Sequence, residues 1–109
     1  MWRCGFCGYM WDGEEPPDEC PKCGSAKEKY VELEDKVAEL VERSRFSNSL
    51  HMSLFALLEQ VMDVAEDGID ENLDPACVKI FTQAMEHAEF LQQSIKAELE
   101  GHMNKGKWG

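Results

Sequence analysis

The chain has 109 residues, of which 22 are acidic and 11 are basic, so its net charge is −11. That length accommodates one ordinary domain or two small ones, and the negative charge argues against nucleic acid, whose phosphates would be repelled. No stretch approaches the roughly 20 apolar residues of a membrane helix, and the N-terminus lacks the basic run and apolar core of a signal peptide. We therefore expect a soluble, cytoplasmic protein that does not contact membranes.

The composition changes near residue 33. The first 33 residues hold four of the five cysteines and three of the four prolines, which is typical of loops and short strands, whereas the remainder is rich in Leu, Val, Met, Glu and Ala. The sequence therefore predicts an α+β fold: a small metal domain over residues 1–33, a helical region over 34–101 and a mobile tail over 102–109. Because disulfides rarely persist in the cytoplasm, the paired cysteines indicate metal or redox chemistry.

Two short motifs carry the chemistry of the first segment. They read Cys4-Gly-Phe-Cys7-Gly and Cys20-Pro-Lys-Cys23-Gly, and twelve residues separate them. Each two-residue spacer lets both sulfurs reach one metal, and two such motifs facing each other make a tetrahedral cage of four sulfurs, which suits iron or zinc. Gly8 and Gly24 can adopt a positive φ, and this conformation directs backbone N–H groups at the sulfurs and tunes the site.

The residues around these cysteines resemble a known family. The run Trp2-Arg-Cys4-Gly-Phe-Cys7-Gly-Tyr-Met-Trp11 is similar to the start of a rubredoxin domain, and Cys20-Pro-Lys-Cys23-Gly matches its second motif. The short gap with Pro16-Pro17 is most similar to the rubredoxin-like domain of rubrerythrins. The resemblance covers residues 1 to about 33, where Lys29-Tyr30 stands at the basic and aromatic positions that close the small sheet. It implies a three-stranded sheet and one iron that cycles between the ferric and ferrous states.

The residue types favour electron transfer over catalysis. Five aromatic side chains would form a core beneath the cage: Trp2, Phe6, Tyr9, Trp11 and Tyr30. A closed shell of four thiolates leaves no open position for a substrate, so we expect an electron carrier with an unknown redox partner protein rather than an enzyme. The alternative is a zinc ribbon that stabilises an interaction scaffold without redox activity, because the four-sulfur geometry alone does not select the metal.

Three helices are predicted in the second segment, over residues about 34–46, 49–67 and 74–100. Val37, Leu40, Val41 and Ser44 keep one helical spacing, and a second stripe out of phase with the first predicts a break near residues 47–49. That second stripe comprises Leu50, Leu54, Leu57, Val61 and Val64.

The ends of these helices are read from cap residues. Asp67-Gly68 reads as a helix stop, Asp74-Pro75 as an N-cap followed by proline at the first helical position, and Gly101 as the end of the last helix. The last helix carries one apolar stripe of seven residues: Val78, Phe81, Met85, Ala88, Gln92, Ile95 and Leu99.

Further apolar residues fall outside these stripes. They are Phe55, Leu58 and Met62 on one helix and Ile80, Phe90 and Leu91 on the next. Because contiguous exposed apolar surface is rare on monomers, we expect a homo-oligomer, a dimer or larger, that completes a helical bundle.

A second metal site in the helices would need Glu-x-x-His motifs, as in di-iron bundles. No histidine here completes one, so the peroxidase chemistry of rubrerythrins does not carry over. A dimeric peroxidase or ferroxidase that gathers Glu59, Glu66, Glu86 and Glu89 is the least favoured alternative. Cys77 lies where a helix N-terminus can lower a thiol pKa, but we expect an inert, half-buried residue.

Overall fold

The computed structural model describes all 109 residues and confirms the α+β class. The chain divides into two compact units, which are described separately below. The first comprises Met1–Arg45 together with Lys105–Gly109, and the second comprises Phe46–Asn104. No helix is long and apolar enough to cross a membrane.

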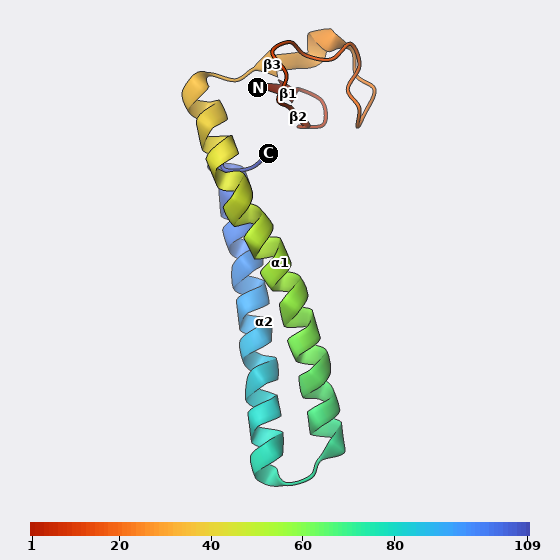
Figure 1. Ribbon diagram of the computed structural model, residues 1–109, viewed down its shortest axis with the longest axis vertical. Helices are drawn as coiled ribbons and strands as arrows, with labels where there is room; N and C mark the ends of the chain where they lie inside the picture. The colour runs from red at the N-terminus through yellow and green to blue at the C-terminus, as the bar shows by residue number, and fades with distance from the viewer. The chain divides into compact units, whose positions relative to one another are not determined.

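The first unit is built on a three-stranded antiparallel sheet (Figure 1). Its strands are β1 (Trp2–Cys4), β2 (Met10–Trp11) and β3 (Tyr30–Glu32), in the order β2-β1-β3, and a 3-10 turn, η1 (Lys27–Lys29), precedes β3. Trp2 pairs with Trp11 on one side, and Cys4 pairs with Tyr30 on the other. This register places the first cysteine and the last aromatic residue of the segment side by side.

The first long helix, α1 (Asp35–Glu71), is continuous, so the predicted break near residues 47–49 is wrong. The polar residues there do not compete with the helix. The hydroxyl of Ser49 donates back to the carbonyl of Phe46, as Ser44 does to Leu40, and Asn48 is buried beside His102, whose Nδ1 lies 2.5 Å from Asn48 Oδ1. The buried positions of α1 therefore continue through this polar segment at steps of three and four residues, from Val41 through Ser44 to Asn48.

The end of α1 also differs from the prediction. The helix runs through Gly68 to Glu71, and the residue in the left-handed conformation is Asn72, with φ of 50°. Gly68 serves packing instead, because a Cβ at this position would meet the ring of Phe81 at 2.3 Å. The glycine is thus a contact site for the second helix and not a helix stop.

The second long helix, α2 (Pro75–Asn104), begins as predicted. The Asp74 carboxylate accepts a hydrogen bond from the backbone N–H of Cys77 at 2.8 Å, and Pro75 occupies the first position. The helix does not end at Gly101 but continues to Asn104. The tail is not free either, because Arg45 Nε donates to the Gly109 carbonyl at 2.6 Å and Trp108 is half-buried. The same Arg45 makes a two-pronged ion pair with Asp12.

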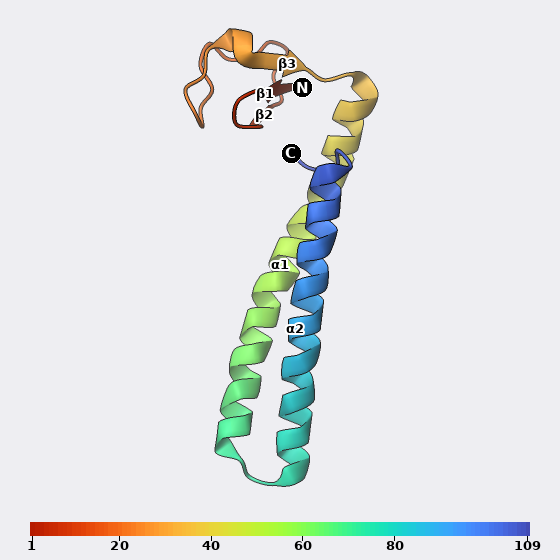
Figure 2. The same ribbon diagram turned by 180° about the vertical axis from the view of Figure 1, so that it is seen from behind.

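In the second unit, α1 and α2 lie side by side and antiparallel, as both views show (Figures 1 and 2). Leu58, Ala88 and Ile95 form the buried core, with Phe55, Met62 and Leu99 packed against it. The predicted stripe of α2 is therefore confirmed as the one that faces α1. The buried stripe of α1, however, is one residue out of phase with the predicted one: Asn48, His51, Phe55, Leu58, Met62, Ala65 and Ile69.

The stripe that was predicted to be buried on α1 is exposed. Its exposed fractions range from 41% at Val61 to 64% at Val64. We call these five residues the outer stripe: Leu50, Leu54, Leu57, Val61 and Val64. The prediction failed because Asn48 and His51 are polar, which hid the true inner stripe from a reading based on apolar residues alone.

Candidate metal centre

All four predicted ligands come together in the first unit. The sulfurs of Cys4, Cys7, Cys20 and Cys23 lie within 4.8 Å of one another, and no other group of three or more Cys, His, Asp or Glu side chains is close enough to hold a metal. Cys4 Sγ is 3.7 Å from Cys23 Sγ, and Cys7 Sγ is 3.7 Å from Cys20 Sγ. These separations are far longer than the roughly 2.05 Å of a disulfide.

The distances fit one tetrahedral metal ion. A tetrahedron built with metal–sulfur bonds of about 2.3 Å has edges of about 3.8 Å, close to the two observed separations. The chain therefore already holds its sulfurs at the spacing that a single iron or zinc ion requires. Because protein ligands fill all four positions, such a site has no place for a substrate.

Two matching turns hold the sulfurs in place. The N–H of Gly8 donates to the Cys4 carbonyl and that of Gly24 to the Cys20 carbonyl, at 2.9 and 2.8 Å. The predicted positive φ is confirmed at both glycines, with values of 77° and 76°. The two glycine N–H groups thus close the turns. The backbone N–H groups of Phe6 and Cys7 donate to the sulfur of Cys4, and those of Lys22 and Cys23 donate to the sulfur of Cys20.

These hydrogen bonds separate the acidities of the thiols. The N–H of Cys7 is the main cause that lowers the pKa of Cys4, against the opposing effect of burial. Burial acts to raise the pKa of Cys20. Hydrogen bonds from the Tyr30 hydroxyl and from the N–H groups of Cys23 and Lys22 outweigh burial and lower this pKa to about 6. The Tyr9 N–H acts to lower the pKa of Cys7, yet burial and the three neighbouring sulfurs raise it to about 11.

This pattern indicates that the cluster is built for a cation. Once some sulfurs are ionised, their negative charge holds the proton on the next one, so four thiolates at this spacing need a positive ion among them. A bound metal ion supplies that charge and displaces the remaining protons.

Two hydroxyl groups at the site were not predicted. Ser25 Oγ lies 3.1 Å from Cys23 Sγ, and since a thiolate can only accept, the hydroxyl is the donor once Cys23 ligates a metal. The buried Tyr30 hydroxyl has no nitrogen or oxygen partner and interacts with Cys20. The sequence signal that could have indicated Ser25 is its position two residues after the ligand Cys23. For Tyr30 the signal is the hydroxyl group, which a purely apolar aromatic residue lacks.

The aromatic core is smaller than predicted. Trp2, Trp11 and Tyr30 pack against the cysteines, and the two indoles donate to backbone carbonyls at Glu14 and Glu15. Phe6, however, is 79% exposed and Tyr9 is 37% exposed, so neither belongs to this core. Cys4 and Cys20 are buried whereas Cys7 and Cys23 are half-exposed, so one edge of the site faces solvent.

The acidic residues considered for a second metal site lie elsewhere, within the second unit. Glu59 accepts a hydrogen bond from Gln92 at 2.8 Å, and Glu86 and Glu89 line a shallow groove with Phe90. The thiol of Cys77 has a raised pKa, chiefly because of its hydrogen bond with the Asp74 carboxylate. This effect opposes that of the helix N-terminus and makes the thiol less reactive.

Comparison with known proteins places the first segment. Residues 2–31 match the family model of the rubredoxin-like domain of rubrerythrin. Reverse rubrerythrin-1 of Clostridium acetobutylicum is 47% identical over 34 residues, which are 31% of this chain and 19% of that protein. Rubrerythrin of Clostridium perfringens is 52% identical over 23 residues, 21% of this chain and 12% of that protein.

These matches are confined to the N-terminal segment, so the chain spans less than a fifth of the length of either relative. No solved structure matches the chain significantly. The four close sulfurs, the paired turns and the family match together establish that residues 2–31 form a rubredoxin-like domain of the rubrerythrin type, able to bind a metal ion.

Proposed function

We propose that the protein carries single electrons through one iron ion held by Cys4, Cys7, Cys20 and Cys23. The observation that carries this proposal is the closed set of four sulfurs, two pairs of which are 3.7 Å apart. Iron in such a site supplies a one-electron couple between its ferric and ferrous states. A full protein ligand set favours transfer of electrons over chemistry on a bound substrate.

The residues of the chain adjust that couple and protect it. The N–H groups directed at Cys4 and Cys20 favour the more negative, reduced state of the site. Trp2, Trp11 and Tyr30 cover the buried side and exclude water. The half-exposed Cys7 and Cys23 provide the route by which electrons enter and leave, beside the exposed ring of Phe6.

The partner is a second redox protein that presents a basic surface to this chain. With a net charge of −11, the chain favours association with a basic surface, and its field increases the rate of encounter. The helical hairpin assembles the protein or docks it.

Metal analysis with a visible spectrum tests the proposal on protein purified without oxygen from its native host. One iron per chain, a red ferric form and reversible one-electron reduction are expected. Zinc alone would support the non-redox scaffold instead. More than one iron per chain together with peroxide-dependent oxidation would support the peroxidase alternative and contradict the electron carrier.

A further inference from the structure

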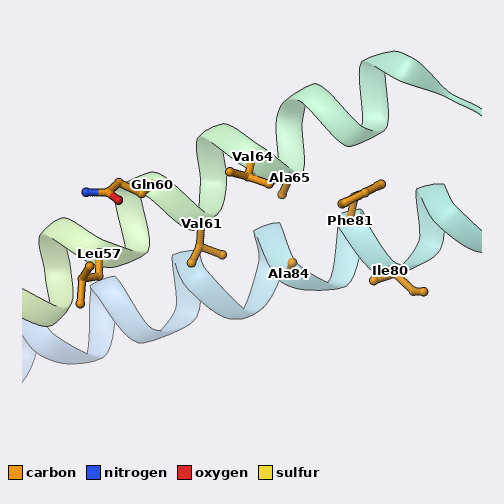
Figure 3. Close-up of a pocket in the computed structure, with 8 residues that line it drawn as sticks. All are labelled: Leu57, Gln60, Val61, Val64, Ala65, Ile80, Phe81 and Ala84. Atoms are coloured by element: carbon orange, nitrogen blue, oxygen red, sulfur yellow. The ribbon is translucent and has the colours of Figure 1, made fainter.

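The second unit has an apolar face that one hairpin leaves uncovered. Three residues of the outer stripe, Leu57, Val61 and Val64, line a groove of about 460 Å³ together with Ile80, Phe81 and Ala84 of α2. Figure 3 shows the side chains of both helices along this groove, where Gln60 is the only polar residue. Leu91, which lies two helical turns beyond Ala84 on α2, is also exposed.

The spacing on α1 is that of a helix with two neighbours. A helix that packs against one partner needs one apolar stripe, whereas a helix in a four-helix bundle contacts two neighbours and carries a wider apolar face. On α1 the inner stripe packs against α2, and the outer stripe, with the same steps of four and three, lies next to it and has no neighbour. The sequence of α1 therefore provides for a further helical layer.

The charges are arranged so that this face can meet a copy of itself. At about 100° per residue, Glu59, Asp63 and Glu66 lie on the side of α1 roughly opposite the outer stripe. On α2, Glu86, Glu89 and Glu100 are likewise turned away from Ile80 and Leu91 by the same geometry. Glu98 of α2 and Glu71 at the end of α1 are the acids on the apolar side, and Glu98 is bonded to His102 at 3.0 Å. Two highly acidic chains can thus associate here without bringing most of their carboxylates together.

The size of the face also fits a second hairpin. The outer stripe runs from Leu50 to Val64, which is about 21 Å along α1. Two helices side by side are about 20 Å wide, so the apolar face measures about 420 Å². A rim of polar residues around such an apolar centre brings a helix-pair interface toward the roughly 800 Å² that each partner buries in a stable complex. Because the face is long and mostly apolar, its occupant must be equally long and apolar, and a second copy of this chain meets that requirement.

We propose that two copies of the chain associate through the outer stripe of α1 and the adjoining residues Ile80, Ala84 and Leu91 of α2, to form a four-helix bundle. The interface is isologous, so each copy contributes the same surface. This inference specifies the assembly role proposed for the hairpin, and it does not depend on which metal the cysteines hold.

Sedimentation equilibrium of the full metal-loaded chain, with a reductant that keeps Cys77 free of disulfides, tests the proposal. The expected mass is twice the 12.4 kDa of one chain. Replacing Leu57 and Val64 by lysine should raise the dissociation constant at least about 100-fold, because two charges per copy would be buried in an apolar interface. The control is Phe90→Lys, which alters an equally exposed side chain outside this groove and should leave the mass unchanged.

The unaltered chain provides a second measurement if the double variant does not fold. The thermal midpoint of the helical signal should rise with protein concentration, as it does for a dimer that dissociates on unfolding. A single-chain mass with a midpoint independent of concentration would overturn the inference, as would an assembly of three or more copies or one that only Phe90→Lys disrupts. Zinc-loaded protein should give the same mass as iron-loaded protein, so failure of the electron-transfer proposal is distinguishable from failure of this one.

Discussion

Single hydroxyl groups adjust the metal centre from inside the fold. The Ser25 hydroxyl lies 3.1 Å from Cys23 Sγ and the Tyr30 hydroxyl acts on Cys20. Reduction of an iron site makes its net charge one unit more negative and its sulfurs stronger acceptors, so a donor to sulfur stabilises the reduced state more than the oxidised state. These two side chains are therefore expected to raise the reduction potential.

Removing either hydroxyl should lower the potential. For Ser25→Ala and Tyr30→Phe we expect decreases of tens of millivolts, because a difference of about 1.4 kcal/mol between the two redox states corresponds to about 59 mV for one electron. Protein-film voltammetry measures the change. Ser25→Thr keeps a hydroxyl and should stay near the unaltered value, and equal potentials for Ser25→Ala and the unaltered chain would show that this contact is not a donor to the metal site.

The glycine that follows Cys23 contributes through its backbone conformation. Gly24 has φ of 76°, and a Cβ there would meet no atom within 4 Å, so the cost of a side chain is purely conformational. Gly24→Ala should destabilise the first unit by about 1–2 kcal/mol, measured as a lower urea midpoint of tryptophan fluorescence. Gly101 also has open space around it but lies within a helix. Gly101→Ala should therefore increase the stability of the helical unit by up to about 1 kcal/mol, seen as a higher midpoint of the helical signal.

At the scale of the elements, the N-terminus of α2 depends on one carboxylate. Hydrogen bonds from Cys77, first its backbone N–H, hold the pKa of Asp74 below its ordinary value. A lowered pKa means that the stabilisation is complete above the pKa of the unfolded chain and is lost only as the pH falls through the folded value. The cap is therefore intact throughout the neutral range.

Asp74→Ala should reduce stability by about 1 kcal/mol, since it leaves helix N–H groups without a partner. Thermal unfolding at a fixed protein concentration should give the same loss from about pH 5 to pH 8, where the carboxylate stays ionised. Asp74→Asn keeps an acceptor oxygen and should recover most of the loss. A loss that grows toward alkaline pH would contradict this account of the cap.

The elements also show what the sequence can and cannot predict. The cysteine motifs, their glycines and the Asp74-Pro75 cap were predictable because each has a local cause that does not depend on the rest of the fold. The course of α1 was not, because Asn48 is buried through a contact with His102, 54 residues away. Likewise, Gly68 reads as a helix stop until the ring of Phe81 is placed against it. Local residue types were thus informative where the interaction is local and misleading where the second helix supplies the partner.

For the whole molecule, the two units rely on different sources of stability. The first unit has three short strands and only three buried residues at its centre, two of which are cysteines. A domain this small buries too little apolar surface to offset its loss of conformational entropy, so a metal ion must supply part of the free energy of folding. The second unit has a core of its own between α1 and α2.

Removing the metal should therefore unfold one unit and spare the other. Trp2 and Trp11 lie in the sheet, whereas Trp108 lies in the tail that follows α2, so in a Trp108→Phe background the tryptophan signal reports on the sheet alone. A strong chelator under reducing conditions should abolish their near-ultraviolet dichroism while most of the far-ultraviolet helical signal persists, since the hairpin core contains none of the metal-binding cysteines. Adding zinc or ferrous iron back should restore the tryptophan signal, because the binding energy again offsets the entropy of ordering the loops. An unchanged tryptophan signal in the stripped chain would mean that the sheet and its aromatic side chains fold without a metal, and a parallel loss of the helical signal would mean that the two units unfold together.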